Sequence, residues 1–144
     1  MNEVPMGIVE LDIDYRPSDD EPFMNDKQKA YYKRKLEDWK ADILRESKST
    51  IAALQDESDK MPDAADRASS ETDRSIELRA RDRQRKLINK IDLALKRIED
   101  GSYGYCEDTG EPIGLKRLEA RPIATLSIEA QERHERREKI YKDD

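Results

Sequence analysis

Two carboxylates stand three residues apart in the stretch Met61–Ala68, and they are the residues best placed to act on a partner. The stretch separates two long helical patterns of similar length, so Asp63 and Asp66 are expected at the tip of a helical hairpin. By spacing alone they would cap the second helix, because the dipole at a helix N-terminus favours negative charge. A small chain that holds two carboxylates at the end of a long probe also indicates a tip that acts on something distant.

Cys106 is the second candidate, because the run Tyr103–Gly110 has the form of a zinc knuckle. A four-cysteine finger would need a second thiolate at position 109 and another pair about 15–20 residues later. Those positions hold Thr109, Ser127 and Ala130. One thiolate, two hydroxyls and a methyl group do not form the tetrahedron of a structural zinc site. The sequence therefore predicts no zinc.

Without a metal, the knuckle is expected to hold together by packing and hydrogen bonds. The predicted core residues are Tyr103, Tyr105, Ile113, Leu118, Leu126 and Ile128. Cys106 is the only cysteine, so no disulfide forms within the chain, and we expect an inert buried thiol in preference to an oxidisable one. His134 is the only histidine and is expected as a surface side chain.

Two long helices must position these residues. Asn25 is a strong N-cap with Gln28 at the capping-box position, and the first helix is expected to end near Glu57 or Ser58. Its heptad seam is Tyr32, Leu36, Trp39, Ile43, Ser47, Thr50 and Leu54. About 30 residues at 1.5 Å each give roughly 45 Å of reach.

The second helix is expected to start between Ser69 and Ser75 and to end at Gly101, which is a typical C-terminal cap. Its seam is Ile76, Ala80, Gln84, Leu87, Ile91, Ala94 and Ile98. A last, heavily charged helix is expected from about Thr125 to Lys139. Before the first helix, Val9, Leu11, Ile13 and Tyr15 alternate with acidic residues, which predicts a short extended segment with one buried face.

Composition narrows the class of protein. The chain has 144 residues, of which 43% are charged and 35% hydrophobic, a balance that suits long helices with narrow buried stripes. The net charge of −6 argues against charge-driven binding of nucleic acid. No apolar run reaches the ~18–20 residues of a membrane span, and no secretory signal begins the chain. A cytoplasmic protein is expected.

The predicted fold is mainly α. A long antiparallel coiled-coil hairpin projects from a small globular base that contains a degenerate zinc-finger-like knuckle and the C-terminal helix. Residues 1–32 are assigned to the base, 33–100 to the hairpin with its tip near 59–70, and 101–144 to the knuckle and last helix.

Four motifs resemble the DksA family of RNA polymerase-binding transcription factors, over a span from about Phe23 to about Lys139. They are Asp63-x-x-Asp66-x-Ala68, Glu77-Leu78-Arg79-Ala80-Arg81-Asp82-Arg83-Gln84-Arg85-Lys86-Leu87-Ile88, Glu99-Asp100-Gly101-Ser102-Tyr103-Gly104-Tyr105-Cys106 and Ile113-Gly114-Leu115-Lys116-Arg117-Leu118-Glu119-Ala120-Arg121-Pro122. Many members carry four cysteines. This chain is similar to the single-cysteine, zinc-independent members.

The resemblance implies a regulator that is not an enzyme. Such a factor inserts its hairpin into the secondary channel of bacterial RNA polymerase, contacts no promoter bases, and modulates initiation together with guanosine tetraphosphate in the stringent response. We expect a monomer. In the matching tip motif, Asp63 and Asp66 would pair with basic polymerase groups, while Ala68 would permit close approach.

The resemblance also implies two further contact sets. Arg83 matches a position that touches the polymerase rim. Leu87, Lys90 and Arg121 match positions that contact guanosine tetraphosphate, and Gln131 stands where many members have a basic residue. Arg suits bidentate phosphate contact, whereas Lys acts as a point charge. Taken without the resemblance, these side chains would be ordinary surface charges.

Two other functions stay open at this point. One is a transcript-cleavage factor of the same channel, whose tip carboxylates lend a ligand to a catalytic magnesium. Two carboxylates without a preformed cage bind magnesium weakly, which disfavours this role. The other is a generic coiled-coil adaptor, for which Asp66→Asn would leave function intact.

Overall fold

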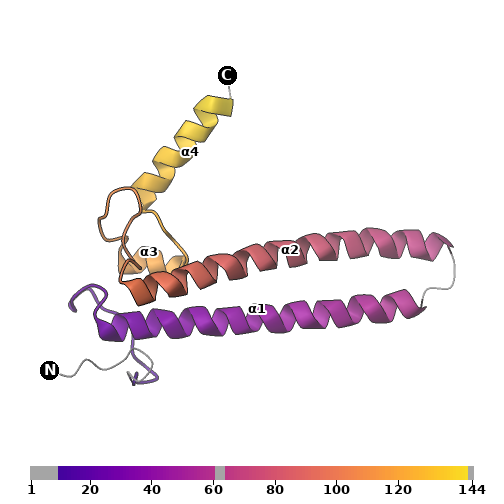
Figure 1. Cartoon of the computed structure of the whole chain (residues 1–144), viewed down its shortest axis with the longest axis horizontal. Coiled ribbons are helices and arrows are strands. Elements are labelled where there is room, and N and C mark those ends of the chain that lie inside the picture. The colour runs from indigo at the N-terminus through magenta and orange to yellow at the C-terminus, as the bar shows by residue number, and fades with distance from the viewer. Residues whose placement is uncertain (1–9, 61–63, 143–144) are drawn as a thin grey trace. The chain divides into compact units, whose positions relative to one another are not determined.

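The computed structural model describes residues 10–60 and 64–142, apart from the side chains of residues 50, 53–55, 57–60, 64–69 and 141–142. These ranges form four helices, α1 (Asp26–Lys60), α2 (Ala64–Asp100), α3 (Leu115–Ala120) and α4 (Ile128–Lys142), as Figure 1 shows. One isolated antiparallel bridge joins Tyr105 and Pro112. The mainly α fold is confirmed. Over the same ranges, no helix is both long and apolar enough to cross a membrane.

Contacts divide the chain into two compact units. The knuckle unit contains residues up to Leu36 and from Leu93 onward, and the coiled-coil unit is Glu37–Asp92. Helices α1 and α2 each contribute residues to both units. The unit boundaries therefore fall within the helices, near residues 36 and 92, rather than at the ends of the two long elements.

The start of α1 follows half of the predicted capping box: Asn25 caps the helix, but the Gln28 side chain accepts from the N–H of Met24 instead of that of Asn25. The Gln28 N–H donates to Asn25 Oδ1 at 2.9 Å, and the Met24 N–H donates to Gln28 Oε1 at 2.8 Å. The Gln28 side chain is fully buried, and its Nε2 donates to Ser18 O at 3.3 Å. Each polar group of this buried amide thus has a partner, so the cap also ties the preceding loop to α1.

The second long helix begins earlier than expected. Helix α2 starts at Ala64, whereas the seam pattern placed its start between Ser69 and Ser75. The first helix likewise continues to Lys60, beyond Ser58. Alanine has the highest intrinsic helix propensity, and Ala64, Ala65 and Ala68 favour helix before the seam begins. The connection between the helices is therefore short.

Cross-helix contacts show that the coiled-coil unit is antiparallel. Lys40 Nζ lies 2.7 Å from Asp92 Oδ1, and Ser47 Oγ donates to Gln84 Oε1 at 2.7 Å. Seven residues forward along α1 correspond to eight residues backward along α2. Ser47 and Gln84 therefore form a polar layer in the seam, which specifies the register at a cost in stability.

The predicted seam is correct along most of α2 and wrong at one residue. Ile91 is fully buried, and Ala80 and Leu87 are half-buried. Ile76, however, is 56% exposed. A two-helix coil covers only a narrow stripe of each helix, because no third element closes over its margins. On α1, Ile43 is buried while Trp39 is only half-buried.

The core of the knuckle unit is built on tyrosine and leucine. Tyr32, Leu36 and Leu118 are fully buried, and the Tyr103 hydroxyl donates to Pro122 O at 2.8 Å. Tyr105, Ile113 and Leu126 are half-buried. Ile128 was predicted in this core but is 52% exposed. It occupies the first turn of α4, where Ala130 is the residue that faces inward with no exposed surface.

Glu119 joins α3 to α1. Its carboxylate accepts hydrogen bonds from the Tyr31 hydroxyl at 3.3 Å and the Tyr32 hydroxyl at 3.2 Å, and it forms a 3.0 Å ion pair with Lys35. Burial, reinforced by this carboxylate, raises the pKa of Tyr32. The phenol therefore stays protonated and remains a hydrogen-bond donor.

The expected extended segment before α1 is not present. The chain turns at Ile13 and Asp14, and the Tyr15 N–H donates to Asp12 O at 3.0 Å. Ile13 is 89% exposed, whereas Tyr15 is half-buried and packs edge-on against Tyr31 at 6.1 Å. The alternating pattern failed because no neighbouring strand is present among the described residues to pair with it. Val9 lies outside the described residues.

Candidate functional site

The tip motif is only partly described. Asp66 and Ala68 are the third and fifth residues of α2, so both belong to its first two turns. Asp63 and the side chains of Asp66 and Ala68 lie outside the described residues. A carboxylate in the first turn of a helix interacts favourably with the helix dipole. The backbone position of Asp66 is compatible with a capping role and with an effector role, and both stay predictions.

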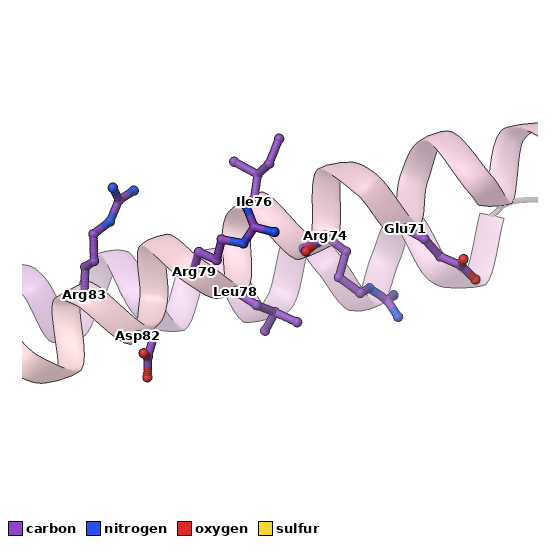
Figure 2. A pocket seen from close by; sticks show the side chains of 8 residues that line it. Glu71, Arg74, Ile76, Leu78, Arg79, Asp82 and Arg83 are labelled. Carbon is purple, nitrogen blue, oxygen red and sulfur yellow. The ribbon is translucent and has the colours of Figure 1, made fainter.

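A shallow hollow lies on α2 within the coiled-coil unit, and Figure 2 shows its side chains. Its apolar part consists of Ile76 and Leu78, which are 56% and 46% exposed. Arg79 and Arg83, one turn apart, are also exposed. The complete lining is Glu71, Arg74, Ser75, Ile76, Leu78, Arg79, Asp82 and Arg83. We call this set the α2 surface.

The α2 surface combines exposed apolar side chains with fixed positive charge. In Figure 2, Arg83 and Ile76 extend to one side of the ribbon, and Leu78 and Asp82 to the other. Asp82 lies 3.8 Å from Lys86 Nζ, an exposed pair of little energetic value. Such a surface can bind a protein partner that offers apolar and acidic groups. The sequence signal for it was overlooked: residues two apart on a helix face different ways, so Ile76 and Leu78 could not both face α1.

The residues matched to nucleotide contact belong to both units. In the coiled-coil unit, Leu87 is half-buried and Lys90 is exposed, and their spacing places them on one face of α2. In the knuckle unit, Arg121 follows α3 and is exposed. Gln131 lies in the first turns of α4, where its Nε2 donates to Glu135 Oε1 at 3.2 Å. Lys90 and Arg121 are therefore available to solvent.

Cys106 lies at the centre of the knuckle turn and is only 3% exposed. Its N–H donates to Glu111 O at 2.8 Å, and its carbonyl accepts from the Gly110 N–H at 2.8 Å. Burial by itself raises the pKa of the Cys106 thiol. Hydrogen bonds to the sulfur from the Thr109 hydroxyl and the N–H groups of Ser127, Thr109 and Asp108 outweigh burial and lower the pKa to about 6.

The four finger positions do not fit a zinc ion. The Thr109 hydroxyl accepts from the Glu111 N–H at 3.2 Å, and the Ser127 hydroxyl caps α4 by accepting from the Ala130 N–H at 3.2 Å. Ala130 offers a buried methyl group. Throughout residues 10–60 and 64–142, no group of three or more His, Cys, Asp or Glu side chains is arranged to hold a metal. A structural zinc site needs four donors, and this one has a single thiolate.

Two side-chain contacts flank the knuckle turn. Arg97 Nη1 lies 3.5 Å from Glu107 Oε1, and Arg97 Nη2 donates to Tyr105 O at 3.1 Å. His134 Nε2 lies 2.7 Å from Asp108 Oδ2. His134 was expected as a surface side chain, and it is only part-exposed and paired. No local pattern could have revealed a partner 26 residues away.

Comparisons with known proteins agree with this architecture. Residues 28–98 match the family model for the DnaK suppressor protein DksA, N-terminal domain, and residues 101–136 match the prokaryotic dksA/traR C4-type zinc finger. The chain is 71% identical over 131 residues to the RNA polymerase-binding transcription factor DksA of Caulobacter vibrioides, covering 91% of this chain and 92% of that protein. It is 46% identical over 125 residues to the protein of the same name from Escherichia coli, covering 87% and 83%.

A solved structure shares the fold. The transcription factor DksA2 from Pseudomonas aeruginosa superposes with a TM-score of 0.76 at 42% identity, covering 81% of this chain and 90% of that one. The two family models together match both long helices and the knuckle, residues 28–98 and 101–136. The chain belongs to the DksA family.

Proposed function

We propose that this protein binds bacterial RNA polymerase and regulates transcription initiation. The observation that carries the proposal is the 71% identity, over nearly the whole of both chains, to a protein named as an RNA polymerase-binding transcription factor. Neither that relative nor the E. coli relative is named as an enzyme. We infer a cytoplasmic regulator that performs no chemistry, acts as a monomer and does not bind DNA directly.

The antiparallel α1–α2 pair is the element suited to enter the secondary channel of the polymerase. Asp63 and Asp66 would then act near the catalytic centre by pairing with basic polymerase groups. Ala68 has a side chain small enough to let the two backbones approach. This role uses the charge of the carboxylates directly and needs no metal. Two tip carboxylates without a cage also bind magnesium weakly, which disfavours a metal-dependent role.

The α2 surface supports a second contact with the polymerase. Arg83 is exposed and has an exposed isoleucine and leucine within two turns, at positions 76 and 78. Interfaces draw most of their energy from a few well-packed side chains, among which arginine is enriched. We infer that Arg83 contacts the polymerase rim and that Ile76, which extends to the same side of α2, becomes buried there.

Guanosine tetraphosphate is the proposed co-regulator, which would place the protein in the stringent response. Lys90 and Arg121 are exposed cations, and cations of these types bind phosphate. Leu87 supplies an apolar contact beside Lys90. Gln131 carries no charge, and its amide already contacts Glu135. We expect Gln131 to contribute less to phosphate affinity than a basic residue would.

The test is transcription in vitro from a ribosomal RNA promoter, with and without guanosine tetraphosphate. The wild-type protein is expected to inhibit initiation, and more strongly with the nucleotide. Asp66→Asn should abolish inhibition while polymerase binding largely persists. Asp73→Asn changes an exposed carboxylate two turns further along α2, and it should behave as wild type.

Three results would contradict the proposal. Loss of polymerase binding by Asp66→Asn would make the tip an anchor rather than an effector. Unchanged inhibition by Asp66→Asn would favour a generic coiled-coil adaptor. Shortening of RNA in a backtracked complex would identify a transcript-cleavage factor.

A further inference from the structure

We propose that Ser47 and Gln84 are positioning residues, whose hydrogen bond holds the far parts of α1 and α2 in a single arrangement. The Ser47 hydroxyl donates to Gln84 Oε1 at 2.7 Å across the coiled-coil unit, and the pair is partly buried. Both residues occupy seam positions, where a coiled coil ordinarily has apolar side chains. Two apolar side chains would stabilise the coil more, so the polar layer serves an end other than stability.

Packing between the two helices becomes sparse at the polar layer. On one side of it, the coiled-coil unit has two buried side chains, Ile43 and Ile91, and both lie within two turns of the layer. On the other side, none of the described side chains of residues 48–60 and 64–83 is buried. Apolar packing therefore specifies the arrangement of the two helices only as far as the layer.

A directional contact is suited to this place. Ile76 occupies a seam position two turns beyond Gln84, yet it is 56% exposed, so its burial does not hold the helices together. Apolar side chains pack against many neighbours and lose a unique arrangement before they lose stability. A hydroxyl and an amide oxygen form a hydrogen bond only where the two groups meet at the right distance and angle.

The length of helix beyond the layer amplifies any error at the layer. Helix α1 continues from Ser47 to its end at Lys60, which is about 20 Å at 1.5 Å per residue. A change of about 10° in the direction of α1 at the layer would move its far end by about 3–4 Å over that length. Such a displacement is as large as a hydrogen bond is long, so a contact made from that end would be lost.

The consequence for regulation rests on the proposed function. Asp66, in the first turn of α2, would act on the polymerase from the far end of the coil. Its effect would therefore depend on Ser47 and Gln84, although neither needs to touch the polymerase. The arrangement of the helices can be measured without the polymerase, so the two inferences are tested separately.

Distances between spin labels test the arrangement. The labels are attached to Ala52→Cys in α1 and Glu77→Cys in α2, two exposed positions beyond the layer. Cys106 is 3% exposed, so it stays unlabelled in the folded protein. With the wild-type layer we expect one narrow distance distribution, and its width should at least double in Ser47→Ala and in Gln84→Ala. An unchanged width in both variants would overturn the proposal.

Three further variants separate the hydrogen bond from stability. The exchanged pair, Ser47→Gln with Gln84→Ser, keeps both groups across the seam and should restore the narrow distribution. The apolar pair, Ser47→Leu with Gln84→Leu, should raise the melting temperature without restoring it. Asp92→Ala is the matched control: it breaks the 2.7 Å contact with Lys40 in the packed part and should leave the width unchanged. A narrow distribution for the apolar pair would show that packing suffices, against the proposal.

Transcription from a ribosomal RNA promoter then measures the effect on regulation. Gln84→Ala and the apolar pair should each weaken inhibition at least threefold, and the exchanged pair should recover most of it. The apolar pair decides the matter, because a role in stability alone predicts inhibition at least as strong as that of the wild type. Full inhibition by the apolar pair would overturn the positioning role. A wild-type protein that does not inhibit would contradict the proposed function, and the distance distributions would still decide the role of the layer.

Discussion

Stability of the folded protein should depend on pH through Cys106. The folded-state pKa of this thiol is about 6, against 9.0 for an unperturbed one. The unfolded chain therefore binds more protons between these values, so stability rises with pH across the interval. The contribution is fully present above about pH 9 and is lost as the pH falls through about 6.

The magnitude follows from the shift and its surroundings. A shift of three pKa units converts to about 4 kcal/mol at 1.36 kcal/mol per unit. The neighbouring Glu107, Asp108 and Thr109 are exposed, so solvent screens the charge. We reduce the figure for this screening and expect the free energy of unfolding to rise by about 2 kcal/mol between pH 6 and pH 9.

Urea denaturation at pH 6, 7, 8 and 9 measures this effect, with Cys106→Val as the reference. The variant retains every other titrating group, so the difference in unfolding free energy between the two proteins isolates the thiol. That difference should grow in favour of the wild-type protein by about 2 kcal/mol from pH 6 to pH 9. A difference that stays flat, or that shrinks with rising pH, would refute a stabilised thiolate.

Two further predictions concern the knuckle unit. Leu118→Ala removes a fully buried side chain and should lower the free energy of unfolding, measured by urea denaturation, by about 3 kcal/mol. The control Leu93→Ala, at a residue that is 61% exposed, should change the free energy of unfolding by less than about 0.5 kcal/mol. Equal effects of the two variants would contradict the assigned core. Replacing Thr109, Ser127 and Ala130 together by cysteine should create a finger that binds one zinc per chain, because four thiolates then stand at the family spacing. Elemental analysis measures the bound zinc, and a folded variant without zinc would contradict this prediction.

Local signals predicted the long elements well. Asn25 and Gln28 are close in sequence, and their capping contacts depend only on the first turn of α1. Gly101 ends α2 as expected, with a φ of 85° that favours glycine. Periodicity failed at Ile13 and Ile76, where burial depends on whether another element covers the side chain.

The knuckle shows the opposite case. The residue types of Cys106, Thr109, Ser127 and Ala130 were sufficient to predict a donor set that does not fit zinc, because ligand chemistry is readable from residue types. They could not show how the segment that leads into α4 meets the loop after Cys106. That contact, in which the Glu107 N–H donates to Thr125 O at 2.9 Å, is specified only by the folded chain.

The sequence by itself determined the helical hairpin, its seam pattern, the family and the pair of carboxylates at positions 63 and 66. These depend on residue types at short and regular spacings. Only the tertiary structure decided that Cys106 is buried, that His134 lies against Asp108, and that Ile76 and Leu78 stay open to solvent. The physical reason is that such contacts join residues distant in sequence, or depend on the absence of a covering neighbour, and neither condition leaves a local signal.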